Sequence, residues 1–218
     1  MTRRSFQRPL GERRYRKQFV VAVEGKLTEQ QYFEQLRGFT PLIHIVCVPE
    51  NEKSAPAYVL KRLKNYLRDN PLRETDEAWL VVDRDEWPPS ELDKLHTWTR
   101  RDPRFALAVS NPAFELWLLL HFQNAGPAST HQTVRQLLSK HLPGYEKSLS
   151  KHRISEAQIQ SALQRARAVD LPPCTTWPMN PGITTVYRLV ERVRVIRRID
   201  EARNRRNPVV RQGDTSIR

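Results

Sequence analysis

Three acidic residues stand directly after two apolar segments of the sequence. Glu24 follows the apolar run 18–23, and Asp83 and Asp85 follow the run 78–82 in the order Asp-Arg-Asp. In an extended segment, two residues separated by one other point to the same side. Carboxylates placed in this way suit Mg²⁺ or Mn²⁺, which prefer oxygen ligands and leave positions open for water and phosphate oxygens. The chemistry indicated is metal-assisted hydrolysis of a phosphodiester.

Each of these carboxylates also has an ordinary structural explanation. Glu24 would then be a helix cap or a solvated turn residue, and the aspartate pair would be neutralised by Arg84 or Arg100. The Asp-x-Asp spacing also occurs in glycosyltransferases and in HAD-type phosphotransferases. A HAD-like phosphatase is disfavoured because Trp87 stands where a small residue is usual. The metal site is favoured by the combination of three carboxylates at strand ends in a basic chain.

Further polar residues close to these positions are candidates for the same site. Glu115 lies within the apolar segment 112–122, where a charge is costly unless it is paired or bound to a ligand. A salt bridge or a helix cap is the alternative for Glu115. Glu29 is placed in the first turn of the next predicted helix, where interaction with the helix dipole or support of the site is as well founded as a catalytic role. Lys26 is a candidate phosphate contact, with a solvated lysine as the alternative.

The segments around these residues alternate between buried strands and helices. The predicted strands are 18–23, 42–48, 78–82 and 105–109, and the predicted helices between them are 28–38, 56–67 and 90–99. This alternation is typical of βαβ units, which build a mostly parallel sheet with ligand sites at the carboxyl ends of its strands. Glu24 and Asp83 are therefore expected at one edge of the sheet.

The second half of the chain is expected to be helical. Its predicted helices are 112–122, 131–141 and 155–169, followed by a proline-rich loop, 171–181, and a last helix. Ile183 and Val186 are expected on the inner face of that last helix. Its outer face is expected to carry Arg188, Arg192, Arg194, Arg197 and Arg198. The predicted fold class is α/β with a mostly parallel sheet and a helical C-terminal extension: one domain over 18–200, a basic arm at 1–17 and a basic disordered tail at 201–218.

The composition excludes several classes of protein. The chain has 218 residues, of which 39% are hydrophobic, so it can form a packed domain and is neither disordered throughout nor collagen-like. Cys47 and Cys174 lie far apart without a metal-binding spacing, which indicates free thiols in a reducing cytoplasm. No apolar stretch approaches the roughly twenty residues that span a bilayer, and the N-terminal residues lack the pattern of a signal peptide. A cytoplasmic protein without a membrane partner is expected.

The positive charge is concentrated at the two ends of the chain. Residues 1–17 hold seven basic residues and one acidic residue, and residues 188–218 hold ten and four, so each end carries a net charge of +6 out of +13. Basic flanks suit a polyanion, because each phosphate contact releases counterions. Nucleic acid is the predicted partner, contacted by Arg84 and the arginines of the last helix. Solvated tails are the alternative.

Five motifs in this sequence together resemble one protein family. They are VAVEGKLTEQQYF at 21–33, VVDRD at 81–85, SNPAFELW at 110–117, PGYEK at 143–147 and NPGITTVYRLV at 180–190. In this order they resemble the motifs of the RloB-like proteins, and the resemblance extends from residue 19 to residue 193.

This resemblance implies a Toprim-like domain, similar to that of topoisomerases, primases and OLD-type nucleases, in a bacterial family associated with restriction and abortive-infection loci. By the same resemblance, Glu24 is an acid, a base or a metal ligand, and Asp83 and Asp85 bind Mg²⁺. Glu115 of the Asn-Pro-x-Phe-Glu motif is a further site residue, and Lys147 of the Tyr-x-Lys pattern contacts phosphate. The turn after Glu24 departs from the general Toprim sequence, which leaves the role of Glu29 open.

The expected function is therefore metal-dependent hydrolysis of phosphodiesters in nucleic acid during anti-phage defence, with other defence-locus proteins as candidate partners. RNA such as tRNA is favoured over DNA. No tyrosine stands out as a topoisomerase-like nucleophile. The alternative is a non-catalytic nucleic-acid-binding or effector subunit of a defence complex.

Overall fold

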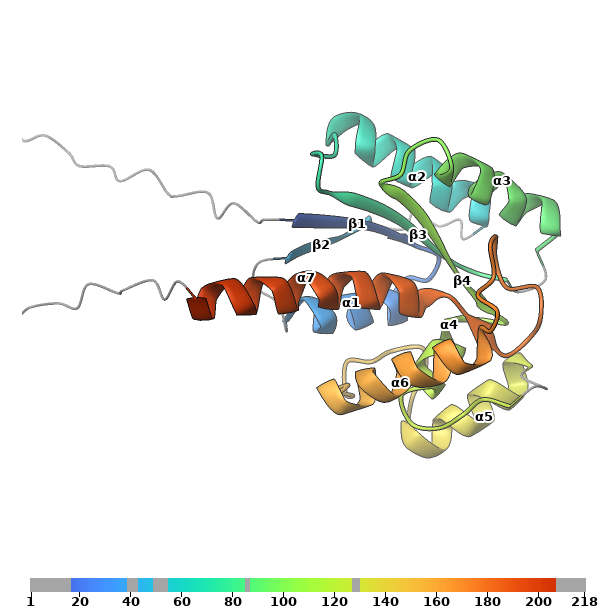
Figure 1. Ribbon diagram of the computed structural model, residues 1–218. Helices are drawn as coiled ribbons and strands as arrows, with labels where there is room; N and C mark the ends of the chain where they lie inside the picture. The colour runs from blue at the N-terminus through green and yellow to red at the C-terminus, as the bar shows by residue number, and fades with distance from the viewer. Residues whose placement is uncertain (1–16, 39–42, 49–54, 85–86, 127–129, 207–218) are drawn as a thin grey trace, which may run out of the picture.

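A five-stranded sheet forms the centre of the described structure (Figure 1). The computed structural model describes residues 17–38, 43–48, 55–84, 87–126 and 130–206. Its strands are β1 (Lys17–Val23), β2 (Ile43–Val48), β3 (Glu77–Asp83), β4 (Phe105–Asn111) and β5 (Ile183–Thr184). They lie in the order β2-β1-β3-β4-β5, with the first four parallel and β5 antiparallel to β4. The predicted α/β fold with a mostly parallel sheet is confirmed, and its arrangement is Rossmannoid.

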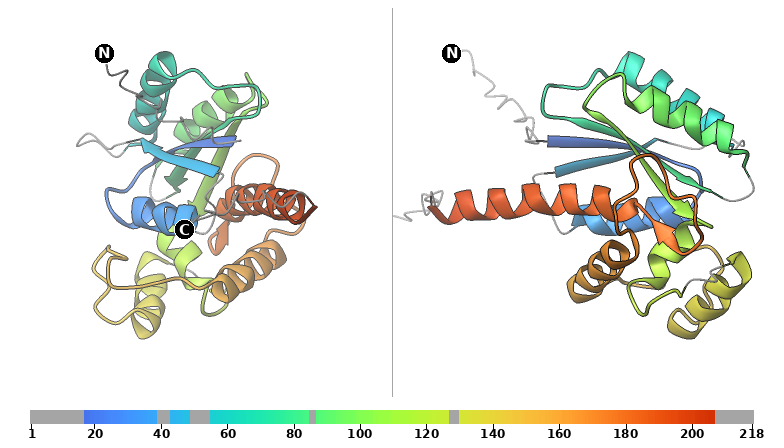
Figure 2. Two further views of the ribbon diagram at one scale, coloured as in Figure 1. Left: turned by 90° about the vertical axis from the view of Figure 1, so that its left-hand side faces the viewer. Right: turned by 45° about the vertical axis from the view of Figure 1, so that its right-hand side comes forward.

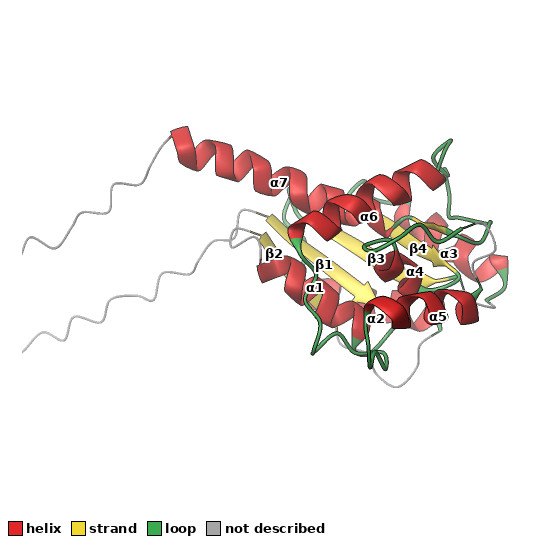
Figure 3. Cartoon of the chain, turned by 90° about the horizontal axis from the view of Figure 1, so that it is seen from below, coloured by secondary structure: helices red, strands yellow, loops and turns green. Residues whose placement is uncertain are grey.

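Helices cover both faces of this sheet. They are α1 (Thr28–Gly38), α2 (Pro56–Asp69), α3 (Pro89–Thr99), α4 (Phe114–Leu119), α5 (His131–His141), α6 (Glu156–Val169) and α7 (Val186–Arg206). Helices α2 and α3 lie on one face, whereas α1 and α7 lie on the other, with α4, α5 and α6 stacked beyond them (Figures 1 and 2). Viewed from below, α6 and α7 lie over the sheet (Figure 3). The helical C-terminal extension therefore adds a further layer to one face.

The alternation of side chains along the strands produces two separate cores. In β1, Phe19 and Val21 pack toward α1 and α7, whereas Val20 and Ala22 pack toward α2 and α3. All four are buried. A strand buried on both faces reads as a continuous apolar run, which is why these strands could be predicted from the sequence.

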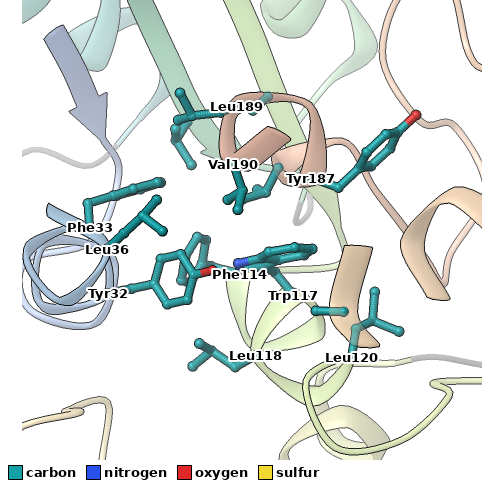
Figure 4. Close-up of a cluster of buried hydrophobic side chains, with 14 of the residues drawn as sticks. Tyr32, Phe33, Leu36, Phe114, Trp117, Leu118, Leu120, Tyr187, Leu189 and Val190 are labelled. Atoms are coloured by element: carbon teal, nitrogen blue, oxygen red, sulfur yellow. The ribbon is translucent and has the colours of Figure 1, made fainter. Parts of the chain in front are cut away.

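One aromatic cluster fixes α1 against α4 and α7 (Figure 4). The ring of Tyr32 in α1 lies edge-on to Phe114 and Trp117 of α4, with centroid distances of 5.6 and 6.1 Å. The hydroxyl of Tyr32 lies 3.2 Å from Nε2 of His121, which is also buried. Burial lowers the pKa of His121 to about 4, so this histidine is neutral at physiological pH. Helices α1 and α4 both begin beside acidic residues predicted to form the site, Glu29 and Glu115. This aromatic cluster therefore sets the distance between the two sides of that site.

Three expectations about the second half differ from the structure. The helix predicted over 112–122 is shorter, because β4 continues to Asn111 and the backbone of Ala113 is extended. Ile183, expected on the last helix, belongs instead to β5. Helix α7 continues to Arg206, within the segment predicted as a disordered tail, and residues 207–218 lie outside the described residues.

Ion pairs link β1, β3 and α7 at the edge of the sheet where β1 and β3 begin. Glu77, the first residue of β3, accepts hydrogen bonds from Lys17 at the start of β1 and from Arg192 of α7. It also accepts a bond of 2.9 Å from the indole of Trp79. These contacts lower the pKa of Glu77 against the effect of its burial, so the carboxylate stays ionised. The start of β1 and the middle of α7 are thereby fixed at the same edge.

Two further expectations concern the cysteines and the membrane. Cys47 and Cys174 are free thiols, as predicted, and burial raises the pKa of Cys47 to about 12. Among the described residues, every helix is too short or too polar to cross a bilayer.

Candidate active site

Glu24 lies where β1 ends and is fixed to the end of β3. Its backbone N–H donates to the carbonyl of Val81, which extends the pairing of the two strands by one residue. Its Oε2 accepts a hydrogen bond of 3.0 Å from the backbone N–H of Asp83, and its Oε1 accepts one of 3.2 Å from the indole of Trp87. The side chain is therefore held, almost fully buried, against the neighbouring strand.

Asp83 is the last residue of β3 and faces the start of α4. Its Oδ1 accepts a hydrogen bond of 2.9 Å from the backbone N–H of Phe114. Loss of hydration raises the pKa of Asp83 well above its usual range, and the charges of Glu29, Glu24 and Glu115 raise it further. Asp83 and Glu24 thus lie at one edge of the sheet, as the sequence predicted. Asp85 lies outside the described residues.

Glu29 turns back from the first turn of α1 into the same site. Its Oε1 accepts a hydrogen bond of 3.1 Å from the backbone N–H of Gly25, and only 6% of the residue is exposed. Burial, followed by the charges of Glu115 and Glu24, raises the pKa of Glu29 to about 7. A Cβ atom at position 25 would lie 2.2 Å from Oε2 of Glu29, so a larger residue there would displace this carboxylate.

Glu115 approaches from the first turn of α4, on the opposite side of the site. The hydroxyl of Tyr145 lies 3.5 Å from Oε1 of Glu115 and 3.0 Å from the hydroxyl of Thr28, the first residue of α1. Burial, followed by the charge of Glu115, raises the pKa of Tyr145, so its hydroxyl stays protonated. Tyr145 therefore joins the starts of α1 and α4 across the site.

Replacing Tyr145 by Phe is expected to lower the free energy of unfolding by about 1–2 kcal/mol, because the largely buried hydroxyl of Thr28 loses its partner. Urea unfolding followed by circular dichroism measures the change. Tyr58→Phe, which alters a more exposed tyrosine of α2, is the matched control. Equal stability of Tyr145→Phe and the wild type would show that this hydrogen bond does not hold the two helices together.

Four acidic side chains from three parts of the chain therefore share one place, which we call the carboxylate cluster: Glu24, Glu29, Asp83 and Glu115. Within the described residues, no lysine or arginine forms an ion pair with Glu29, Asp83 or Glu115. Like charges close together disfavour ionisation, which contributes to the raised pKa values. A cation is the natural complement to this arrangement.

The residues present fit a divalent cation by their chemistry. The donors are carboxylates without histidine or cysteine, which suits Mg²⁺ or Mn²⁺ better than zinc or copper. In the part of the chain that the structure describes, no three His, Cys, Asp or Glu side chains form a ready-made metal site. Mg²⁺ commonly takes only one or two protein carboxylates and keeps several waters. Glu24 and Asp83 suffice for such a site.

The basic residues predicted to contact nucleic acid fall into two groups. Lys26 and Lys147 are exposed, and Lys26 follows Glu24 by two residues. Arg84 is engaged locally: its guanidinium donates to the carbonyl of Trp87 and lies 5.4 Å from the ring centre of Trp177. Lysines are therefore the exposed basic groups on the loops around the cluster.

Three arginines of α7 are held in ion pairs. Arg188 pairs with Asp170 at 2.8 Å, and Arg192 pairs with Glu77. Arg194, expected on the outer face, is instead buried and pairs with Glu156 at 2.6 Å. The side chains of Arg197 and Arg198 lie outside the described part of the structure. A seven-residue strand is about 20 Å long, so Arg192, at the start of β3, lies far from Asp83 at its end.

Sequence reasoning missed two residues that position Glu24. Arg62 of α2 is buried, and its Nη2 donates a hydrogen bond of 2.6 Å to the carbonyl of Val23, directly before Glu24. Trp87 donates to Glu24 itself. A signal for Arg62 was present, because it stands on the apolar face of α2 beside Val59 and Leu63.

Fold and site together define an α/β protein with a carboxylate cluster at the carboxyl edge of a mostly parallel sheet. The protein-family model described as RloB-like protein matches residues 19–193. The chain belongs to the RloB-like family, as its motifs predicted. No curated protein and no solved structure matches the chain.

Proposed function

We propose that this protein is a nuclease that requires a divalent metal ion and hydrolyses phosphodiesters in nucleic acid, in the cytoplasm of a bacterium defending itself against phage. The observation that supports this most is the hydrogen bond from the backbone of Asp83 to Glu24, which brings two carboxylates from different strands to one edge. The raised pKa values of Asp83 and Glu29 support it further, since burial raises both and the neighbouring carboxylates of the cluster raise them more.

In the proposed mechanism, Glu24 and Asp83 would hold Mg²⁺ or Mn²⁺. The Asp-Arg-Asp sequence adds Asp85 as a third proposed ligand. The metal supplies Lewis-acid stabilisation of charge and activation of water when it is bound. Glu24 would also exchange a proton with the reacting groups. The hydroxyl of Tyr145 and the backbone N–H of Phe114 hold Glu115 and Asp83 in place, which fixes the two sides of the site between which a phosphodiester would lie.

A non-catalytic nucleic-acid-binding subunit is the second candidate. One observation favours it: the basic charge at the two ends of the chain suits nucleic-acid binding whether or not the carboxylates bind a metal. In that case the carboxylate cluster would have no catalytic use, and its neutralisation would leave every function unchanged. The basic charge of +13 would still serve nucleic-acid binding.

Purified protein incubated with tRNA, single-stranded RNA and double-stranded DNA separates the two candidates. We expect cleavage of at least one substrate with Mg²⁺ or Mn²⁺ and none with EDTA, measured on denaturing gels. Cleavage that persists in EDTA would argue against the metal. Binding without cleavage in every condition would favour the binding subunit.

A further inference from the structure

A pocket of about 500 Å³ opens beside the carboxylate cluster, between α5 and the loop that follows it. It is lined by Arg135, Gln136, Ser139, Tyr145, Glu146 and Lys147. Two of these side chains are cationic and one is anionic, so the lining carries net positive charge. The pocket therefore differs from the carboxylate cluster next to it in the sign of its charge.

Tyr145 connects this pocket to the cluster. It lines the pocket, while its hydroxyl lies 3.5 Å from Glu115 and 3.0 Å from Thr28. Arg135 is close enough to Tyr145 to act on the ionisation of its hydroxyl. One side chain thus forms the boundary between the acidic site and the basic pocket.

The two cations of the pocket are available to a ligand. Arg135 and Lys147 are exposed, and within the described residues neither forms an ion pair. The arginines of α7 differ, since Arg188, Arg192 and Arg194 are all paired with acids. An anion that reaches the pocket therefore meets two cations without displacing an existing partner.

Lys147 is held in an unusual backbone conformation. Its φ of 55° lies in the left-handed region, which disfavours a lysine and suits glycine or asparagine. Outside glycine, it is the residue with positive φ in the described chain. Strained backbone of this kind occurs where a side chain must point to a particular place. Here the residue in this conformation is Lys147, which lines the pocket.

We infer that this pocket binds a phosphate of the nucleic-acid strand next to the phosphate that lies at the carboxylate cluster, with Arg135 and Lys147 as its ligands. Arg135 offers the forked donors that match phosphate oxygens, and Lys147 adds a compact charge. This inference rests on the proposed function, because it takes nucleic acid as the substrate. A nucleic-acid strand bound in this way runs from the carboxylate cluster toward α5, away from the ion-paired Arg188, Arg192 and Arg194 of α7.

The test measures binding in EDTA, so that cleavage plays no part. The probes are a short fluorescein-labelled single-stranded RNA and the DNA of the same sequence, followed by fluorescence anisotropy at several salt concentrations. The pocket variants are Arg135→Gln and Lys147→Asn. The matched controls are Arg101→Gln and Lys61→Asn, which alter exposed cations on the α2 and α3 side of the sheet.

Each pocket variant is expected to weaken binding about tenfold, as the removal of one charged hydrogen bond does. The slope of log affinity against log salt concentration should also become shallower by about 0.7 for each phosphate that is no longer neutralised. The control variants should bind like the wild type. Lys147→Asn should melt no lower than the wild type, since asparagine accepts the left-handed conformation, which separates weaker binding from a failure to fold.

Equal losses of affinity with RNA and DNA would support a phosphate ligand, because both share it. A loss confined to RNA would overturn it in favour of an interaction with the 2′-hydroxyl. Pocket variants that bind like the wild type, control variants that weaken binding equally, or a wild type that binds neither probe would also overturn it. Wild-type binding without cleavage in metal, weakened in the pocket variants, would support the pocket while refuting the proposed nuclease.

Discussion

Replacing Asp83 by Asn is expected to reduce metal-dependent cleavage about a thousandfold, the effect of losing roughly 4 kcal/mol of metal-assisted stabilisation of the transition state. Asparagine keeps the shape of the side chain and still accepts the hydrogen bond from Phe114. It removes the negative charge, however, and amide oxygens bind Mg²⁺ much more weakly than carboxylates do. Initial cleavage rates at several metal concentrations measure the reduction.

The control for this variant is Asp69→Asn, the same chemical change at an exposed residue at the end of α2, whose side chain is 67% exposed. It should cleave like the wild type. Asp83→Asn should still bind nucleic acid in EDTA at least as tightly as the wild type, because a negative charge has been removed beside the substrate. Unchanged cleavage by Asp83→Asn would contradict the metal site, and loss of both binding and cleavage would indicate a structural role instead.

The contribution of Glu29 to the free energy of unfolding of the metal-free protein is expected to fall as the pH rises. The buried His121, whose pKa is lowered to about 4, contributes in the opposite direction, so the effect of Glu29 is measured as the difference between the wild type and Glu29→Gln. Glu29 has a pKa of about 7 in the folded protein and 4.5 as its ordinary value, so the folded state holds the proton more tightly. Stability contributed by this proton is complete below about pH 4.5 and is lost as the pH rises to about 7. The decrease from Glu29 alone is on the order of 3 kcal/mol. Asp83, whose pKa is also raised, changes stability in the same direction.

Urea unfolding in EDTA across this pH range tests the expectation. The free energy of unfolding of the wild type relative to Glu29→Gln should fall between about pH 4.5 and 7, whereas the difference between the wild type and Glu74→Gln, at an exposed glutamate, should stay constant. Added Mg²⁺ should restore stability above neutral pH in the wild type, because a cation that binds only the folded protein stabilises it. A difference between the wild type and Glu29→Gln that does not change with pH in this range would contradict the raised pKa of Glu29, and a wild-type stability that does not respond to Mg²⁺ would contradict a cation site at the cluster.

The sequence predicted those features that depend on the residues of a single segment, such as a buried strand and the position of its carboxyl end. Strands buried on both faces produce apolar runs such as Val20 and Val21, and the residue after such a run must lie at the carboxyl edge of a parallel sheet. Glu24 and Asp83 could therefore be placed from the sequence alone. Glu115 could be singled out because a charge stood in an otherwise apolar helix.

Contacts between distant segments could not be predicted in this way. The bond from Arg62 to Val23 and the bond from Tyr145 to Thr28 depend on how α2 and the loop after α5 pack against β1 and α1. The spacing of apolar residues in α7 predicted that Arg194 is exposed. That spacing carries no information about α6, which packs against α7 and supplies the partner of Arg194. The two-residue strand β5 is too short to produce any pattern of its own.

The parts of the carboxylate cluster leave the ribosome at very different times. Glu24 is synthesised first, Asp83 only after β2 and α2, and Glu115 and Tyr145 later still. Parallel strands pair through long loops, and such pairings form late in folding. A growing chain therefore carries single carboxylates without the neighbours that make them a site. In the proposed function, the cell's own nucleic acid is exposed to cleavage only by chains whose synthesis has passed the loop after α5.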